Sequence, residues 1–248
     1  MADILANHFS LELGLAVFLL FFCAVIQGYS GFGGGVLVVP IMAMLFDPVT
    51  GIALLCIPFF IGMLFIVPGA IKDVNWREVI PLALFSSLAI VVGQNFLLSA
   101  DSKSVKIAMG CVIVCIAILF LRNWTYKGIR NLYTTGMVGI ATGGTTGAFG
   151  IPGGPIAVMY YLSARIKPAE QRANILLTGF LNTVVFLTGF IFHGVYEKVS
   201  VVDSGILVPG FIIGSILGQY LFKMMPTKWF SKATAIMLLV IGLVTIVA

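Results

Sequence analysis

The sequence has very little charge. Only 9% of its 248 residues are Asp, Glu, Lys or Arg, whereas 60% are hydrophobic and the mean hydropathy is +1.13. A soluble domain is about one quarter charged, so this chain lacks the polar surface that such a domain needs. The shortage excludes an ordinary soluble protein and indicates an integral membrane protein, because a run of about 20 apolar residues crosses a bilayer core.

Residues that commonly bind metals or form disulfides are also scarce. There are two histidines and four cysteines, and all four cysteines stand inside apolar runs, where Cys usually acts as a small hydrophobe. We therefore expect no disulfide framework, no metal and no cofactor. The net charge of +5 does not predict binding to nucleic acid, because the basic residues are scattered between apolar runs rather than gathered in one patch. The N-terminal residues have no Lys or Arg before the first apolar run and do not read as a cleaved signal peptide.

The apolar runs predict an all-α membrane protein. Six segments are long enough to cross the bilayer as helices: 49–71, 79–98, 105–121, 173–192, 202–222 and 233–248. Four shorter segments form two pairs, each joined by a glycine-rich stretch: 11–27 with 36–46, and 132–146 with 155–164.

The chain contains an internal repeat. Four glycines of the first glycine-rich stretch recur in the second at a displacement of 119 positions, so that Gly28 matches Gly147 and Gly34 matches Gly153. Further on, "VVGQNFLL" resembles "ILGQYLFK". Such duplications are common in secondary transporters. We divide the chain into a first transmembrane repeat (1–121), a cytoplasmic linker (122–130) and a second transmembrane repeat (131–248).

The distribution of Lys and Arg favours a re-entrant hairpin for each short pair. If each pair crosses the membrane once, the basic residues divide almost evenly between the two sides. If each pair returns to its own side, one side holds eleven basic residues and the other three, which is the bias expected of a cytoplasmic face. The hairpin arrangement gives each repeat three true crossings, inverts the second repeat relative to the first and places both termini outside the cytoplasm. The eleven are Lys72, Arg77, Arg122, Lys127, Arg130, Arg165, Lys167, Arg172, Lys223, Lys228 and Lys232; the three are Lys103, Lys106 and Lys198.

The glycine-rich stretches predict an anion site. Irregular backbone is tolerated at membrane depth only where protein or a wet cavity surrounds it, and a short helix begins after each stretch, at about Val36 and at Pro155. Helix starts offer free N–H donors and the positive end of the helix dipole. We expect the two tips to meet near mid-membrane and to bind a compact anion through these substrate-binding residues: Gln27, Tyr29, Ser30, Gly31, Gly33, Gly34, Gly35, Thr145, Thr146, Gly150, Gly153, Gly154 and Asn182.

Three motifs resemble those of the sulfite exporter TauE/SafE family, also called the toluene sulfonate uptake permeases. They are "GFGGGVLVVP", "KDVNWREVIPLAL" and "GAFGIPGGPIAVMYYL". The resemblance covers essentially the whole chain. It implies a membrane transporter that moves sulfite, a sulfonate or a related organosulfur anion, in a bacterial plasma (inner) membrane, and it leaves substrate and direction open. A homo-oligomer is compatible with the sequence.

Two other functions fit parts of the sequence. A channel would need a continuous pore and no alternating access. The string "GYSG" matches the G-x-S-G of rhomboid intramembrane proteases, in which Ser30 would need His193 as its base. A four-residue match is weak, and His193 stands at the edge of a predicted span, so we expect no enzyme.

Overall fold

The computed structural model describes residues 11–30, 33–122, 124, 126–151, 154–164, 166–224 and 228–247, and this part of the chain contains helices and no strand. Six helices are long and apolar enough to cross a membrane. They confirm the predicted all-helical membrane class. They are α2 (Leu11–Ser30), α4 (Pro48–Ala70), α5 (Trp76–Ser99), α6 (Ser102–Leu121), α9 (Pro168–Phe192) and α10 (Val201–Met224).

Four further α-helices and two short 3-10 helices complete the described part of the chain. They are α3 (Gly34–Leu45), α7 (Leu132–Phe149), α8 (Pro155–Leu162) and α11 (Lys228–Val247), and two short 3-10 helices follow α4 and α9, η1 (Ile71–Asp73) and η2 (Val195–Glu197).

Several helix boundaries differ from the predicted segments by a few residues. The first apolar run, predicted as a short hairpin arm, forms the 20-residue helix α2, which is long enough to span a bilayer by itself. Helix α3 begins at Gly34 rather than at Val36, whereas α8 begins at Pro155 as predicted. The last predicted span begins earlier, at Lys228.

Polar side chains fix several helix starts. The Asp47 carboxylate accepts from the N–H groups of Val49 and Thr50 at 3.0 and 3.2 Å, with Pro48 at the first helical position. At the start of α7, Asn131 and Thr134 cap each other reciprocally. These caps explain why the apolar runs begin as helices where they do.

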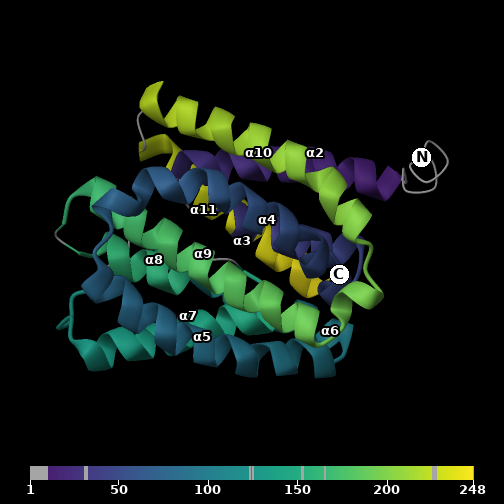
Figure 1. Cartoon of the computed structure of the whole chain (residues 1–248), viewed down its shortest axis with the longest axis horizontal. Coiled ribbons are helices and arrows are strands. Elements are labelled where there is room, and N and C mark those ends of the chain that lie inside the picture. The colour runs from purple at the N-terminus through teal and green to yellow at the C-terminus, as the bar shows by residue number, and fades with distance from the viewer. Residues whose placement is uncertain are drawn as a thin grey trace.

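Helices α4 and α9 form the centre of the bundle, and a pair of helices covers each side (Figure 1). The Phe60 and Phe180 rings stack between α4 and α9 with their centroids 5.9 Å apart. Helices α2 and α10 pack together on one side, and α5 and α7 pack together on the other. Each outer pair therefore combines one helix from the first half of the chain with one from the second.

The outer pair α2 and α10 is held at short distance by glycine. Gly214 packs on the Phe21 carbonyl, and Gly218 packs on the Val25 carbonyl and the Tyr29 N–H. The contacts advance in the same direction along both chains, so the two helices run parallel. The stripe of small residues in α10 thus packs helices closely, as expected of small-xxx-small patterns.

The outer pair α5 and α7 repeats these contacts. Gly93 packs on the Gly144 carbonyl and the Ala148 N–H, which are the residues displaced by 119 positions from Val25 and Tyr29. Gly28 packs on the Ser215 carbonyl, and its counterpart Gly147 packs on the Ile90 carbonyl. The two halves therefore pack against each other through equivalent glycine contacts, as expected of the predicted repeat. Their orientation in a membrane stays a prediction.

Helices α7 and α8 form a hairpin. The hydroxyl groups of Thr135, at the start of α7, and Tyr160, near the end of α8, lie 2.7 Å apart. The same end of the bundle holds residues 126–131 and the starts of α5 and α9 (Figure 1), and we call it the linker end. The chain thus enters and leaves this hairpin at one end of the bundle.

Candidate functional site

The first glycine-rich tip lies between α2 and α3 and is capped by its own chain. Gly33 takes a left-handed conformation (φ 93°) immediately before α3, which favours glycine. The Gln27 side chain is 4% exposed, and its Oε1 accepts from the Gly35 N–H at 3.1 Å. This bond occupies one of the helix-start donors that the sequence assigned to an anion.

Other residues predicted at the first tip have packing roles. Gly34 lies against the Cys23 carbonyl and the Gln27 Cβ of α2, so a side chain there would displace α3. Tyr29 is buried beside Gly218 of α10. Gly31 and the Ser30 side chain lie outside the described residues.

The second tip lies between α7 and α8. Gly150 (φ 65°) ends α7, and its N–H donates to the Thr146 carbonyl at 2.7 Å. The Thr146 hydroxyl donates to the Ile151 carbonyl at 3.0 Å, and Gly154 (φ 48°) precedes Pro155, the first residue of α8. Gly153 lies outside the described residues. The first intrahelical bond of α8 comes from the Val158 N–H to the Gly154 carbonyl, so the N–H groups of Ile156 and Ala157 have no acceptor within the helix.

Two buried polar groups at the second tip have no hydrogen-bond partner among the described residues. They are Thr142 Oγ1 and Asn182 Nδ2, and both side chains are 0% exposed. The Asn182 Oδ1 accepts from the Ser86 hydroxyl at 2.9 Å. Ser86 lies against Gly143, the neighbour of Thr142 in α7, and the Thr142 Cγ2 methyl lies against Gly154, directly before α8. Unpaired buried polar groups are rare because each costs about 1–3 kcal/mol, which makes this cluster a candidate ligand site.

Thr145 does not join the cluster. Its hydroxyl donates to the Ala141 and Thr142 carbonyls of its own helix, at 3.0 and 2.9 Å. The sequence pointed to Thr145 and Thr146, but it could not show that Thr142 carries the hydroxyl without a partner among the described residues. It also gave no sign of Ser86, which is 96 residues from Asn182 and meets it only through the packing of α5 on α9.

A narrow cavity lies beside Thr146 and Gly150 of the second tip. Its volume of about 10 Å³ has room for about one water molecule. The described conformation is therefore closed around the second tip, and an anion could enter only if the lining helices moved. The lining residues come from α4, α9 and the second tip rather than from the first tip: Ile52, Leu55, Cys56, Phe59, Thr146, Gly150, Thr183 and Phe186.

The meeting of the two tips in one cavity stays a prediction. Val36, after the first tip, and Ile151, in the second, belong to one apolar core cluster. At the second tip Thr142 Oγ1 and Asn182 Nδ2 lack a partner among the described residues, whereas at the first tip Gln27 caps the start of α3. The two predicted half-sites therefore differ in the described conformation.

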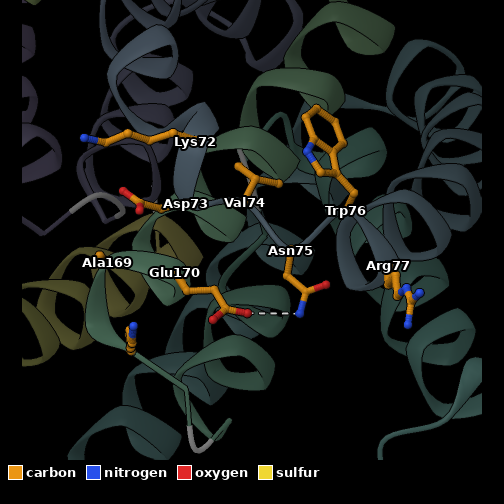
Figure 2. A pocket seen from close by; sticks show the side chains of 9 residues that line it. Lys72, Asp73, Val74, Asn75, Trp76, Arg77, Ala169 and Glu170 are labelled. Carbon is orange, nitrogen blue, oxygen red and sulfur yellow. Dashed lines mark hydrogen bonds between the residues drawn. The ribbon is translucent and has the colours of Figure 1, made fainter.

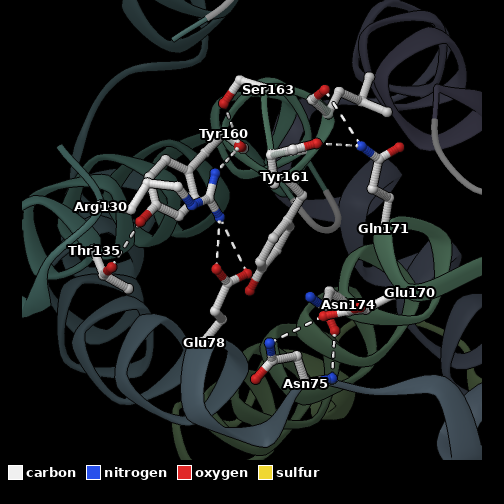
Figure 3. Close-up of polar contacts among 12 residues, drawn as sticks. Asn75, Glu78, Arg130, Thr135, Tyr160, Tyr161, Ser163, Glu170, Gln171 and Asn174 are labelled. Carbon is white, nitrogen blue, oxygen red and sulfur yellow. Dashed lines mark hydrogen bonds and ion pairs between the residues drawn. The ribbon is translucent and has the colours of Figure 1, made fainter. Parts of the chain in front are cut away.

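An ion pair lies at the linker end, beside the hairpin of α7 and α8 (Figure 3). The Arg130 Nη2 lies 3.1 Å from the Glu78 carboxylate at the start of α5, and both side chains are about one quarter exposed. The Arg130 Nη1 donates to the Tyr160 carbonyl of α8 at 2.7 Å, and the guanidinium carbon lies 3.9 Å from the centre of the Tyr160 ring. Arg130 thus ties α5 of the first half to α8 of the second.

Replacing Arg130 with Gln is expected to lower the free energy of unfolding by about 1–2 kcal/mol, because the half-buried Glu78 carboxylate loses its charged partner. Thermal unfolding of purified protein in detergent measures this. In the double variant E78Q/R130Q, the loss of unfolding free energy should be smaller than the sum of the losses in the two single variants. K127Q, at an exposed linker residue, is the matched control; an equal loss in K127Q would contradict the role of the pair.

A bundle of long apolar helices with two glycine-rich helix breaks is typical of a membrane transporter. The sequence matches the family model "Sulfite exporter TauE/SafE" over residues 16–245, and the chain belongs to this family. The family consists of transporters, so the rhomboid-like enzyme is rejected. In agreement, the ring of His193 is exposed and bonds only to the Gly189 carbonyl of its own helix among the contacts described, at 2.8 Å.

Two relatives give the range of similarity. The chain is 24% identical to the "Probable sulfite/organosulfonate exporter TauE" of Cupriavidus necator over 202 residues, which are 78% of this chain and 77% of the relative. It is 25% identical to a "Probable membrane transporter protein" of Xylella fastidiosa over 181 residues, which are 69% of this chain and 66% of the relative. No solved structure shows significant similarity to the chain.

Proposed function

We propose that the protein is a secondary transporter of a small sulfur-containing anion, such as sulfite or a sulfonate, and that the anion binds at the second tip. The observation that carries the proposal is the pair of fully buried, unpartnered groups at the start of α8, Thr142 Oγ1 and Asn182 Nδ2. The sulfur class comes from the family and from the named exporter of Cupriavidus necator.

The donor set suits a compact oxyanion. A hydroxyl, an amide NH₂ and the N–H groups of Ile156 and Ala157 all donate, and the start of α8 adds the positive end of a helix dipole. None of the described residues that line the cavity beside Thr146 is Lys or Arg. Hydrogen bonds to an anion are stronger than those between neutral groups, so such a site binds the anion without holding it as a fixed ion pair. That suits a carrier, which must release what it binds.

The first tip takes the equivalent place in the proposed inverted repeat. Equivalent glycine contacts between α2 and α10 and between α5 and α7 support this arrangement. An anion at the first tip would have to displace the Gln27 side chain from the Gly35 N–H. In this proposal the first tip is therefore a capped counterpart of the second tip. It consists of Gln27, Tyr29, Ser30, Gly31 and Gly33–Gly35.

The proposed orientation places the linker end in the cytoplasm of a bacterial inner membrane and both termini outside. Basic residues support it, because Lys72, Arg77, Arg130 and Lys167 all lie at the linker end.

Transport and binding by the purified protein test the function. Sulfite, thiosulfate, sulfoacetate and taurine are titrated against protein in detergent, and flux of the best ligand is then measured in liposomes. Saturable flux that an anion on the opposite side accelerates is expected of a carrier. Flux that rises linearly with concentration would show a channel, and no binding of any of the four anions would contradict the proposed substrate class.

A further inference from the structure

A second pocket opens at the linker end (Figure 2). Its volume is about 550 Å³, and we call it the vestibule. Its walls come from η1 and from the starts of α5 and α9. The lining residues are Lys72, Asp73, Val74, Asn75, Trp76, Arg77, Lys167, Ala169 and Glu170.

The vestibule has a positive bias. Lys72, Arg77 and Lys167 line it against two carboxylates, Asp73 and Glu170. The Glu170 carboxylate accepts from Asn75 Nδ2 at 3.0 Å, so part of its hydrogen-bonding capacity is used within the wall.

Two long helices also begin at the vestibule. Helix α5 has 24 residues and α9 has 25, and neither Asn75 nor Lys167, which precede them, caps its helix with a side-chain hydrogen bond. Each start therefore presents N–H groups and the positive end of a dipole toward the pocket. Together with the three cations, these helix starts favour an anion.

A buried donor lies directly behind the vestibule wall. Asn174 is 0% exposed, and its Oδ1 accepts from the Asn75 backbone N–H at 2.8 Å. Because that backbone group can only donate, the Asn174 oxygen must face it, and the NH₂ group must point elsewhere. Nδ2 has no hydrogen-bond partner in the part of the chain that the structure describes. In Figure 3 it points toward the space between Tyr161 and Glu78.

Asn174 begins a polar stripe along α9. Thr178 and Asn182 follow at intervals of four residues, which places all three on one face of the helix. All three are 0% exposed. The Thr178 hydroxyl lies 3.0 Å from the Tyr161 hydroxyl, and Asn182 is part of the second tip. The stripe thus joins the vestibule wall to the proposed binding site through buried donors.

We propose that the vestibule is the docking site through which the transported oxyanion reaches the second tip from the linker end, with Asn174 as its first buried donor. This inference rests on the proposed function. The same chemistry suits the phosphate of an anionic lipid headgroup, so the experiment must separate a free anion from a lipid.

The test uses the full-length protein in phosphatidylcholine liposomes, with the linker end facing the medium. The triple variant K72Q/R77Q/K167Q is expected to raise the KM for sulfite about 3- to 10-fold with little change in maximal rate, and the difference should shrink at high salt. The matched control is K103Q/K106Q/K198Q, which removes three positive charges predicted at the opposite face. N174D keeps an acceptor for the Asn75 N–H but replaces the donor by a carboxylate, so transport should fall at least about tenfold while the protein stays folded.

Three results would overturn the inference. They are an unchanged KM in both the triple variant and N174D, an equal rise in the control, and an effect that appears only when phosphatidylglycerol is added. In each of these cases saturable sulfite transport by the wild type would leave the proposed function standing. Absence of saturable transport by the wild type would instead contradict the proposed function itself.

Discussion

Replacing Thr142 with Val is expected to weaken sulfite binding by at least about tenfold without lowering the melting temperature. Valine has nearly the same shape as threonine but no hydroxyl. Thr142 Oγ1 is buried and has no hydrogen-bond partner, so its removal should leave stability unchanged or slightly raised. A lost hydrogen bond to an anion is worth about 1.5–3 kcal/mol, and each 1.4 kcal/mol changes the dissociation constant tenfold.

The matched control is T145V. The Thr145 hydroxyl bonds only to carbonyls of its own helix among the contacts described, so its loss should not change sulfite affinity. Titration of both variants with sulfite, together with thermal unfolding in detergent, separates binding from stability. Equal affinities for T142V and the wild type would remove the Thr142 hydroxyl from the site.

The second large effect is a loss of stability, expected when the glycines at the contacts between the two halves are replaced with alanine. In Gly218→Ala the added Cβ would overlap the Val25 carbonyl, and in Gly93→Ala it would lie about 2.6–2.7 Å from the Ala148 N–H and the Gly144 carbonyl. Because these atoms belong to the backbone, the helices must separate. Overpacking of this kind costs about 1–3 kcal/mol.

Gly205→Ala is the control for this pair. No atom lies within 4 Å of a Cβ at Gly205, and alanine is favoured over glycine within a helix by about 1 kcal/mol. Thermal unfolding should therefore show a loss for G218A and G93A and no loss for G205A. Similar losses in G218A and G93A would support the proposed repeat, whereas a loss in only one would count against the equivalence of the two halves.

Much of the fold could be predicted because hydropathy and glycine spacing act locally. The apolar runs located the long helices, and Pro155 marked the start of α8 because proline suits a first helical position. The spacing of Gly210, Gly214 and Gly218 is typical of close helix packing, and these glycines pack against α2. The prediction from segment length was wrong at one place, because the segment predicted as the first hairpin arm forms the full-length helix α2.

The candidate site was harder to predict because its members meet only through tertiary packing. The glycines drew attention to both tips, yet Gly28, Gly34 and Gly147 pack against backbone atoms of neighbouring helices. Whether Gln27 faces a ligand or caps α3 depends on the turn between α2 and α3, which the sequence does not define. Likewise, the meeting of Ser86, Thr142 and Asn182 depends on how α5, α7 and α9 pack together.

The position of a bound anion tests the central claim most directly. Selenite is a close analogue of sulfite, and its selenium scatters anomalously, so crystals of the protein grown with selenite locate the anion without interpretation of weak density. We expect one selenium peak at the start of α8, with selenite oxygens within about 3 Å of Thr142 Oγ1 and Asn182 Nδ2. A fully occupied peak elsewhere in the bundle, with both of these groups still unpartnered, would contradict the account.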